Sequence, residues 1–373
     1  MEPQTFICED IAIEIFLRLP LKSLLRFQCL SKSFESLISN PTFVKYHVQR
    51  SQKNTNLLFK FHDYYRSFSM VNDKSLSTIV EDFDFGSRLK SKYKVVGSCN
   101  GLVCLIAEDF FKHRAKYLVC LWNPSTKSLS YKPSLLVHSR SWGPSCSMFG
   151  FGYDSLSDTY KVVVLNYKTP KNYESLEYEV NVYNKRYNCW RNIQNFPGYN
   201  PVTRNPGMYL NGTINWLATS KLDWEWNNTL YIVSLDLGNE THKKLSLPSC
   251  FDQAHRYGHC RAKPSLGILK DLLCFSYDDV ERTQFVLWQM NEYGVESSWT
   301  QLLKLSYQAL QIDQECILPP LGTFKNDYLI LIESVEGRLQ TTILDKQEAN
   351  TKIPMNKLWL YTKDYVPSLV PPW

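Results

Sequence analysis

Residues 149–193 read FGFGYDSLSDTYKVVVLNYKTPKNYESLEYEVNVYNKRYNCWRNI. Four short runs rich in aromatic and β-branched residues lie at 149–154, 160–167, 177–183 and 188–193, and turn-forming residues separate them. Runs of this kind are typical of antiparallel strands joined by turns. We therefore expect this stretch to fold as one four-stranded antiparallel sheet.

The same pattern returns along the chain from about residue 57. A short turn between two strands is expected at five places, spaced 54 to 59 residues apart: Asn100-Gly101, Ser157-Asp158, Asn211-Gly212, Lys270-Asp271 and Asn326-Asp327. Asn-Gly is the strongest hairpin signal among them. A repeat of this length, with several strands in each unit, indicates a β-propeller.

The first repeat has too few strands of its own. Its candidate strands lie near 57–61, 67–71 and 75–79, and the C-terminal segment 358–370 could supply the fourth. This pairing would close a ring of about six four-stranded blades and leave no open edge. A ring of seven blades is the alternative count.

The first 50 residues follow a helical period instead. Ile11, Ile15 and Leu19 lie four residues apart, and Pro20 ends that segment. A second helix is expected through 21–28, and Ser31 can cap a third that Asn40-Pro41 ends, with a short fourth helix around 43–48. We therefore expect a helical domain over 1–50 and a propeller domain over 51–373.

The first helix is unusually apolar. Residues 11–19 read IAIEIFLRL, in which seven of nine residues are apolar. A helix that is apolar nearly all round must be covered on several sides, yet a unit of about 45 residues is marginal as an independent fold. Part of this surface therefore belongs either to a partner protein or to the rest of the chain, and the residues alone favour neither.

The composition limits the classes of function. The chain has 373 residues, of which 44% are apolar, 21% charged and 14% aromatic, and the aromatic share favours strands. The net charge of +6 is spread without a basic run, so we expect no nucleic-acid binding. No apolar run approaches the roughly 20 residues of a membrane span, and the N-terminus lacks a secretory signal. Its 11 irregularly spaced cysteines indicate reduced thiols and a cytoplasmic or nuclear location.

Three motifs could carry chemistry, and each has a simpler structural interpretation. The segment 97–101 (GSCNG) could present a nucleophilic cysteine, but a strand is expected after it instead of the required helix. Gly150-Phe-Gly152 lacks the third glycine of a dinucleotide site. A third group has metal-compatible residue types but fits no zinc spacing: Cys250, His255, His259 and Cys260. We therefore predict no enzymatic activity, no cofactor and no bound metal.

The long loops are expected on one face of the propeller. Strands alternate in direction, so the loops after the second and fourth strands of each sheet leave from the same face, and these are the long ones: 108–116, 132–146, 196–207, 219–229 and 248–264. Binding commonly resides on long loops, where Trp, Tyr and Arg contribute most of the energy. The residues that we expect to bind a target protein are Trp142, Tyr199, Arg204, Trp224, Trp226, Arg256 and Tyr257.

In combination, the motifs resemble those of plant F-box proteins with an F-box-associated, kelch-like C-terminal domain. The N-terminal similarity runs through EDIAIEIFLRLP (9–20), KSLLRF (22–27), CLSK (29–32) and LISNPTF (37–43). The C-terminal similarity includes GSCNGLVCL, LWNPSTKS, FGFGYDSLSDTYKVV, LNGTINWLA and WQMNEYGVESSWTQL. It covers nearly the whole chain, and the expected fold is a three-helix F-box followed by a kelch-like propeller.

The resemblance implies a substrate-recognition subunit of an SCF-type cullin ubiquitin ligase. The F-box would dock on a Skp-type adaptor, and the propeller would recruit a target protein that the sequence does not identify. The candidate adaptor-binding residues are Ile7, Cys8, Ile11, Ile15, Leu19, Pro20, Leu24, Leu25, Cys29, Leu30 and Phe34. Two positions depart from the family, which usually has Leu-Pro at 7–8 and Trp at 34, although both positions keep apolar character. Two alternatives are a β-propeller enzyme and a scaffold that binds the adaptor without promoting ubiquitination.

Overall fold

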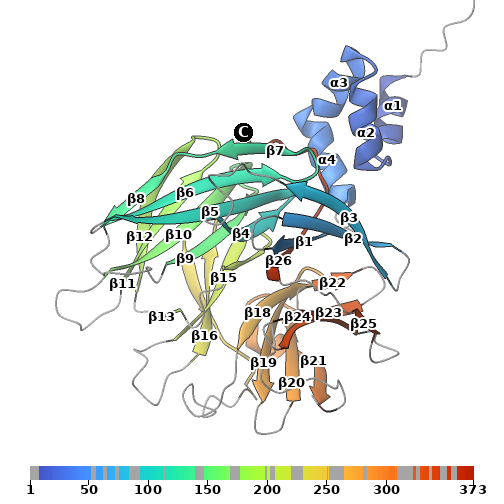
Figure 1. Cartoon of the computed structure of the whole chain (residues 1–373). Coiled ribbons are helices and arrows are strands. Elements are labelled where there is room, and N and C mark those ends of the chain that lie inside the picture. Colours follow the sequence, from blue (N-terminus) through green and yellow to red (C-terminus); the bar gives the residue numbers. More distant parts are fainter. Residues whose placement is uncertain are drawn as a thin grey trace, which may run out of the picture.

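The computed structural model consists of an N-terminal group of helices followed by antiparallel sheets (Figure 1). The prediction of a mainly β chain with a helical N-terminal unit is confirmed. The structure describes residues 8–51, 56–61, 65–71, 75–83, 93–111, 114–138, 147–168, 177–197, 200–201, 206–219, 230–249, 251, 264–279, 284–306, 308, 322–324, 328–335, 338–344, 351–353 and 359–373.

The helices are α1 (Glu9–Phe16), α2 (Leu21–Gln28), α3 (Lys32–Ser39) and α4 (Pro41–Ser51), and together they form what we term the helical unit. The predicted cap of the third helix is confirmed, because Ser31 Oγ accepts a hydrogen bond from the Phe34 N–H at 3.1 Å. The fourth helix is longer than predicted. It has 11 residues and begins at Pro41, since proline fits the first turn of a helix.

The described strands form six sheets. The first contains β26 (Trp359–Tyr365), β1 (Asn56–Phe61), β2 (Tyr65–Val71) and β3 (Ser75–Phe83). The second contains β4 (Tyr93–Cys99), β5 (Leu102–Phe111), β6 (Arg114–Asn123), β7 (Ser128–Tyr131) and β8 (Leu135–His138). The third contains β9 (Met148–Asp154), β10 (Thr159–Lys168), β11 (Glu177–Asn184) and β12 (Cys189–Pro197), which confirms the sheet predicted from residues 149–193.

The remaining three sheets repeat the pattern. The fourth contains β13 (Asn200–Pro201), β14 (Met208–Leu210), β15 (Thr213–Thr219), β16 (Leu230–Asp236) and β17 (His242–Leu245). The fifth contains β18 (Ser265–Leu269), β19 (Leu272–Asp279), β20 (Gln284–Met290) and β21 (Trp299–Ser306), with the 3-10 turn η1 (Glu296–Ser298) before its last strand. The sixth contains β22 (Gly322–Phe324), β23 (Tyr328–Val335), β24 (Arg338–Leu344) and β25 (Thr351–Ile353).

Neighbouring sheets contact one another mainly through the first strands of each sheet. Strand β4 contacts β26 of the first sheet and β9 of the third, β9 contacts β14 and β15, and these two contact β18, which contacts β22. Buried apolar residues fill the space between sheets, for example Val163 and Val182 against Trp216 and Tyr231. The arrangement is propeller-like.

The C-terminal segment supplies the fourth strand of the first sheet, as predicted. Strand β26 pairs antiparallel with β1, and Tyr365 lies opposite Asn56. The tail that follows β26 packs on the second sheet, where the buried Asn123 side chain donates hydrogen bonds to the carbonyls of Ser368 (2.9 Å) and Val370 (2.8 Å). The C-terminal segment is therefore held to the first sheet by strand pairing and to the second sheet by a buried amide.

Three of the predicted turns have the backbone that their residues favour. The φ angle is positive at both Asn100 (50°) and Gly101 (84°), and it is also positive at both residues of 211–212 and 270–271. Two residues with positive φ define the turn that best fits the twist of a hairpin. The turn at 326–327 lies outside the described residues.

A second kind of turn recurs in which Asn or Asp ends a strand. Its side-chain oxygen accepts hydrogen bonds from the N–H groups two and three residues later, at Asn123, Asp154, Asn184 and Asp236. The Ser157-Asp158 turn follows the second of these. The side chain satisfies backbone donors that a tight turn leaves without a carbonyl partner, which is why these residue types recur at the strand ends.

Three segments predicted as long loops contain strands. One of them is 196–207, which contains β13, a strand that pairs with β15. Most of 108–116 belongs to the β5–β6 hairpin, and β8 lies within 132–146 and pairs with β6. Leu135 and Val137 of β8 are buried while Leu136 is 60% exposed. This alternation is the signal of a strand with one face buried, and it is present in the sequence.

Gly150 and Gly152 of β9 allow the fourth sheet to approach closely. A Cβ atom at Gly150 would lie 2.7 Å from Ile214 Cγ2, and one at Gly152 would overlap the ring of Tyr209. The Gly-Phe-Gly motif therefore serves packing between two sheets.

Candidate partner-binding surfaces

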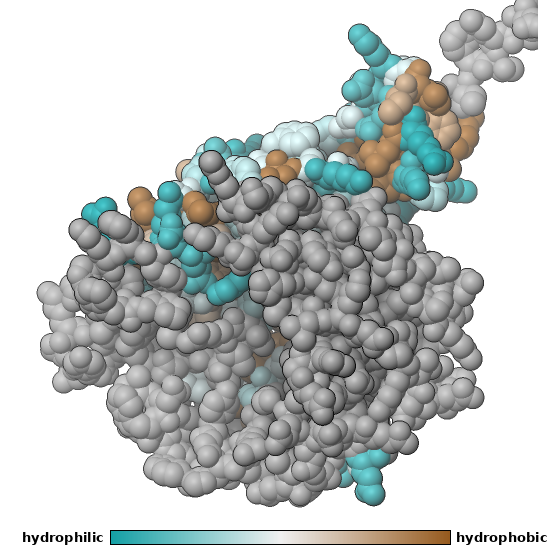
Figure 2. Space-filling view, viewed as in Figure 1, coloured by the Kyte–Doolittle hydropathy of each residue, from teal (hydrophilic) through white to brown (hydrophobic). Residues whose placement is uncertain are grey.

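Helix α1 carries more apolar side chains than the helical unit covers. Phe16 and Leu17 are buried, and Ile13 packs partly on the same core. Ile11 and Ile15, one helical turn apart, remain 55% and 46% exposed. Figure 2 shows apolar side chains gathered over the helical unit, which projects from the sheets. The rest of the chain therefore covers only part of the apolar surface of the first helix.

Other candidate adaptor-binding residues are exposed as well. Leu30, just after α2, is 69% exposed. We define the exposed helical surface by the six candidates that are solvent-exposed: Cys8, Ile11, Ile15, Pro20, Cys29 and Leu30. The candidate at position 7 lies outside the described residues.

The structure corrects the assignment of Leu24. Its side chain is fully buried in the core of the helical unit, so it does not belong to a surface that a partner could reach. Leu19 and Leu25 are partly buried against the same core. Helical periodicity placed these residues on an apolar face, but that face points towards α3 and α4.

Phe34 also has a role inside the helical unit. Its ring packs edge-on against Phe16 and Phe27, with centroids 5.2 and 6.1 Å apart, and the Phe16 and Phe27 rings are 5.1 Å apart. Each ring comes from a different helix, so the cluster fixes α1, α2 and α3 relative to one another. The residue that replaces the family's usual Trp is therefore a packing residue, with part of its surface still accessible.

Helix α4 joins the helical unit to the sheets. Its residues Phe43, Val44, His47 and Val48 are buried. They belong to one continuous core with apolar residues of the second and third sheets and of the C-terminal tail. On the other side, the His47 ring donates from Nε2 to the Leu19 carbonyl at 3.2 Å, and burial lowers the pKa of this histidine. The docked helix makes the orientation of the helical unit a property of the fold.

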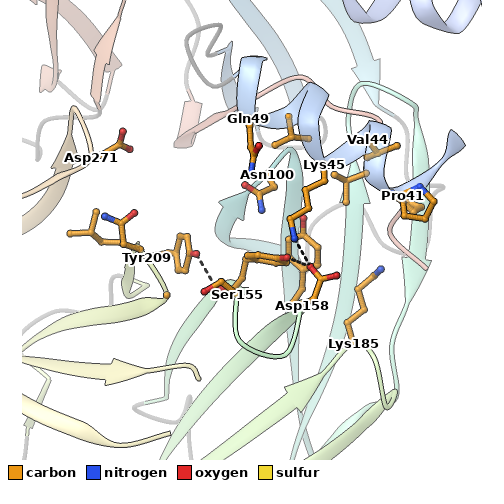
Figure 3. A pocket seen from close by; sticks show the side chains of 18 of the residues that line it. Pro41, Val44, Lys45, Gln49, Asn100, Ser155, Asp158, Lys185, Tyr209 and Asp271 are labelled. Carbon is orange, nitrogen blue, oxygen red and sulfur yellow. Dashed lines mark hydrogen bonds and ion pairs between the residues drawn. The ribbon is translucent and has the colours of Figure 1, made fainter. Parts of the chain in front are cut away.

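A polar contact accompanies this apolar packing (Figure 3). Lys45 Nζ lies 3.2 Å from Asp158 Oδ1, and the Tyr153 hydroxyl donates to the same oxygen. The hydrogen bonds from Tyr153 and Lys45 lower the pKa of Asp158, and the hydrogen bond to Asp158 raises the pKa of Lys45. The Tyr209 hydroxyl donates to the Tyr153 carbonyl at 2.9 Å. The contact links α4 to the third sheet and, through Tyr209, to the fourth.

The face on which α4 lies is the face of the short turns. A cavity of about 710 Å³ beside α4 is lined by turn residues from four sheets, including Asn100, Asp158, Lys185, Asn211 and Asp271. Asp158 lies in a turn after a first strand and Lys185 in a turn after a third strand, so both kinds of turn leave from this face. The loops after second and fourth strands therefore leave from the opposite one.

The candidate target-binding residues all lie outside the described residues: Trp142, Tyr199, Arg204, Trp224, Trp226, Arg256 and Tyr257. Their assignment to the long-loop face remains a prediction.

The described part of the chain contains no group of three or more metal-ligating side chains, and none of its helices is long and apolar enough to cross a membrane. The cluster from Cys250 to Cys260 lies outside the described residues. Cys99 of the GSCNG segment ends β4 before the Asn-Gly turn, as the hairpin interpretation predicts. Burial raises the pKa of its thiol to about 12, which is the opposite of what a nucleophile needs.

Sequence reasoning missed the contact between Lys45 and Asp158. The two residues are 113 positions apart, and neither has a local pattern that points to the other. The Asp158 turn itself was predicted, but its partner depends on where α4 docks. A weak signal was available in α4, where Phe43, Val44, His47 and Val48 follow a helical period.

Comparison with known proteins gives the family. Residues 7–46 match the model of the F-box domain, and residues 48–372 match the model of the F-box associated beta propeller domain. An F-box/kelch-repeat protein of Arabidopsis thaliana is 31% identical over 307 residues, which cover 78% of this chain and 77% of that protein. The F-box protein CPR1 of Arabidopsis thaliana is 27% identical over 361 residues, covering 92% and 83%. The chain belongs to the F-box proteins that carry an F-box-associated β-propeller domain.

Proposed function

We propose that this protein is the substrate-recognition subunit of an SCF-type cullin ubiquitin ligase. One observation carries the proposal: different parts of the helical unit make different contacts. Helix α4 packs on the propeller-like body, whereas Ile11, Ile15 and Leu30 remain exposed on the part of the helical unit that projects from it. Fully burying one such side chain stabilises a contact by roughly 1.5–3 kcal/mol. A Skp-type adaptor is the partner that the F-box family implies for this surface.

The target protein would bind the opposite face. Since α4 covers part of the short-turn face, a partner on that face would compete with the helical unit for space. The long-loop face has no such obstruction from the described residues. The seven aromatic and arginine residues named above are the ones we would test there first.

We further propose that the six sheets are the blades of a closed six-bladed ring. The pairing of β26 with β1 supports this count, because it joins the last strand of the chain to the first sheet. The contacts of β4 with both β26 and β9 are those expected of a second blade between its two neighbours, and they support such a ring.

The proposal is tested by affinity capture from plant tissue with the proteasome inhibited, using three forms of the full chain. Wild type should capture the adaptor, the cullin and a target protein. The double substitution Ile11→Asp with Ile15→Asp should lose the adaptor and the cullin but keep the target. Trp224→Ala with Trp226→Ala should lose the target but keep the adaptor.

Ubiquitination separates a ligase receptor from a scaffold. The target retained by the helical variant should no longer carry ubiquitin, whereas the target captured by wild type should. If its ubiquitination is the same in both, the protein acts as a scaffold. Turnover of a substrate by the purified chain without partners would instead support a propeller enzyme.

A further inference from the structure

The cavity between α4 and the short-turn face has the size of a ligand site. Its volume of about 710 Å³ is within the range of small-molecule pockets. One wall is helix α4, which contributes Val44, Lys45, Val48 and Gln49, and the other walls are turns and strand ends of the sheets. Figure 3 shows the side chains of both walls converging on the same space.

One end of this cavity has uncompensated positive charge. Lys185 lines it, and among the described residues its ammonium group has no carboxylate within ion-pair distance; the contact it makes is with the ring of Tyr160, 5.8 Å away. Lys45, by comparison, is paired with Asp158. Burial lowers the pKa of Lys185, because the ammonium group loses hydration and no carboxylate among the described residues replaces it.

A second lysine, Lys132, does not line the cavity, but its charge interacts with that of Lys185. Burial lowers the pKa of Lys132, and the charge of Lys185 lowers it further. Lys132 Nζ donates to Ser130 Oγ at 2.8 Å. No described carboxylate forms an ion pair with either lysine. An anion placed beside Lys185 would offset the cost of burying its charge and reduce the effect of that charge on Lys132.

The rest of the lining suits an organic molecule more than a bare ion. Val44, Val48, Ile268 and Val370 supply apolar surface, and the half-buried ring of Tyr209 adds an aromatic face. The carboxylate of Asp271 also lines the cavity, but it is exposed and comes from the fifth sheet, away from the lysine end in Figure 3. A ligand could therefore place an anionic group at one end and an apolar body along α4.

We propose that this cavity binds a small organic anion, with its carboxylate or phosphate group on Lys185 and its apolar body between α4 and the ring of Tyr209. The inference goes beyond the proposed ligase role and does not require it. Because the walls come from both the helical unit and the sheets, a ligand bound here stabilises the docked arrangement over any arrangement in which α4 has moved away.

Binding of small probes to the full-length protein tests this proposal. Phenyl phosphate and benzoate are the anionic probes, and benzyl alcohol and benzylamine are the neutral and cationic probes of similar size. Ligand-observed NMR titration should give a Kd on the order of 1 mM for at least one anionic probe, as expected for molecules this small. The neutral and cationic probes should bind at least about tenfold more weakly.

Two variants and a control locate the site. Lys185→Gln should weaken binding of the anion at least about tenfold, which is the loss expected for one charge-assisted hydrogen bond. Gln49→Trp, which places a large side chain at the cavity wall, should weaken all probes that bind. Lys304→Gln removes an exposed lysine of β21 that does not line the cavity and should change nothing. The proposal is overturned if neither anionic probe binds, or if its affinity is the same in wild type, Lys185→Gln and Gln49→Trp.

Discussion

Substituting Lys161 with Met should destabilise the propeller domain more than any surface substitution. The Lys161 side chain is 3% exposed, and its ammonium lies 2.9 Å from Asp154 Oδ2 and 2.9 Å from Glu240 Oε1. It also donates to the Leu237 carbonyl. Three acceptors therefore use its three protons, and they connect the third sheet to the turn after β16 in the fourth.

The loss of stability can be estimated from the carboxylates that lose their partner in Lys161→Met. Met fills a similar volume, so the main loss is the positive charge. Asp154 is 2% exposed and would keep only its hydrogen bonds to the turn that follows it, while Glu240 would keep Arg191. Removing one partner of a buried ion pair costs about 3–5 kcal/mol. For a domain of this size that corresponds to a decrease in Tm of roughly 4–7 °C.

The pKa of Asp154 determines how the destabilisation by Lys161→Met changes with pH. Burial raises the pKa of Asp154, but the hydrogen bonds from Ser157 and Lys161 and the charge of Lys161 outweigh it, so the net pKa is lowered. A carboxyl whose pKa is lowered on folding stabilises the fold above its unfolded pKa, and the stabilisation is lost as the pH falls through the folded pKa. The Tm difference between wild type and Lys161→Met should therefore be constant from about pH 8 to pH 5 and shrink below about pH 4.

Thermal unfolding followed by tryptophan fluorescence measures these effects. The matched variant combines Lys161→Met with Asp154→Asn and Glu240→Gln, which removes all the charges at the centre of the network. It should be more stable than Lys161→Met alone, because no buried charge is left without a partner. A Tm of Lys161→Met close to that of wild type, or a triple variant no more stable than the single one, would refute the reasoning.

Three further predictions concern buried positions. Leu24→Ala should cost about 2–5 kcal/mol of helical-unit stability, seen as loss of helical circular dichroism and of adaptor binding while the sheets stay folded, because Leu24 is fully buried; an unchanged spectrum would contradict this. Gly152→Ala should lower the Tm by the equivalent of about 1–3 kcal/mol, because its methyl group would overlap the Tyr209 ring; a stabilised variant would show that the two sheets are less closely packed. Cys99, whose thiol pKa burial raises to about 12, should resist iodoacetamide at neutral pH while the exposed Cys189 reacts, as mass spectrometry can map; rapid alkylation of Cys99 in the folded protein would reverse that conclusion.

The sheets could be predicted from the sequence because their determinants are local. Asn-Gly at 100–101 and 211–212 selects a turn with positive φ at both residues, and the structure has that backbone at both places. The strands of 149–193 follow from alternation and turn residues within one stretch. Even the long-range pairing of β26 with β1 was predictable, since a repeat short of one strand needs one from elsewhere.

The candidate site was less predictable because it depends on docking. Helical periodicity marks Ile15 and Leu24 alike as apolar-face residues, yet Ile15 is 46% exposed and Leu24 is fully buried. Which face a helix buries is decided by its neighbours, here by α3 and α4. The cavity at Lys185 has the same origin, because its walls come from residues far apart in the chain that meet only when α4 packs on the sheets.

The central claim is that the exposed helical surface binds a Skp-type adaptor, and the affinity of purified adaptor for the full-length chain tests it most directly. Ile15→Asp with Leu30→Asp removes two exposed apolar side chains. Burying their exposed surface in the complex would contribute about 2–3 kcal/mol to binding, or roughly 30- to 200-fold in Kd. The two unpaired carboxylates weaken the contact further. Leu156→Asp, at an apolar position of the propeller that is 76% exposed, is the matched control. The account predicts that isothermal titration detects adaptor binding for wild type and Leu156→Asp and a loss of at least about 30-fold for the double variant; equal affinity in all three proteins would contradict it.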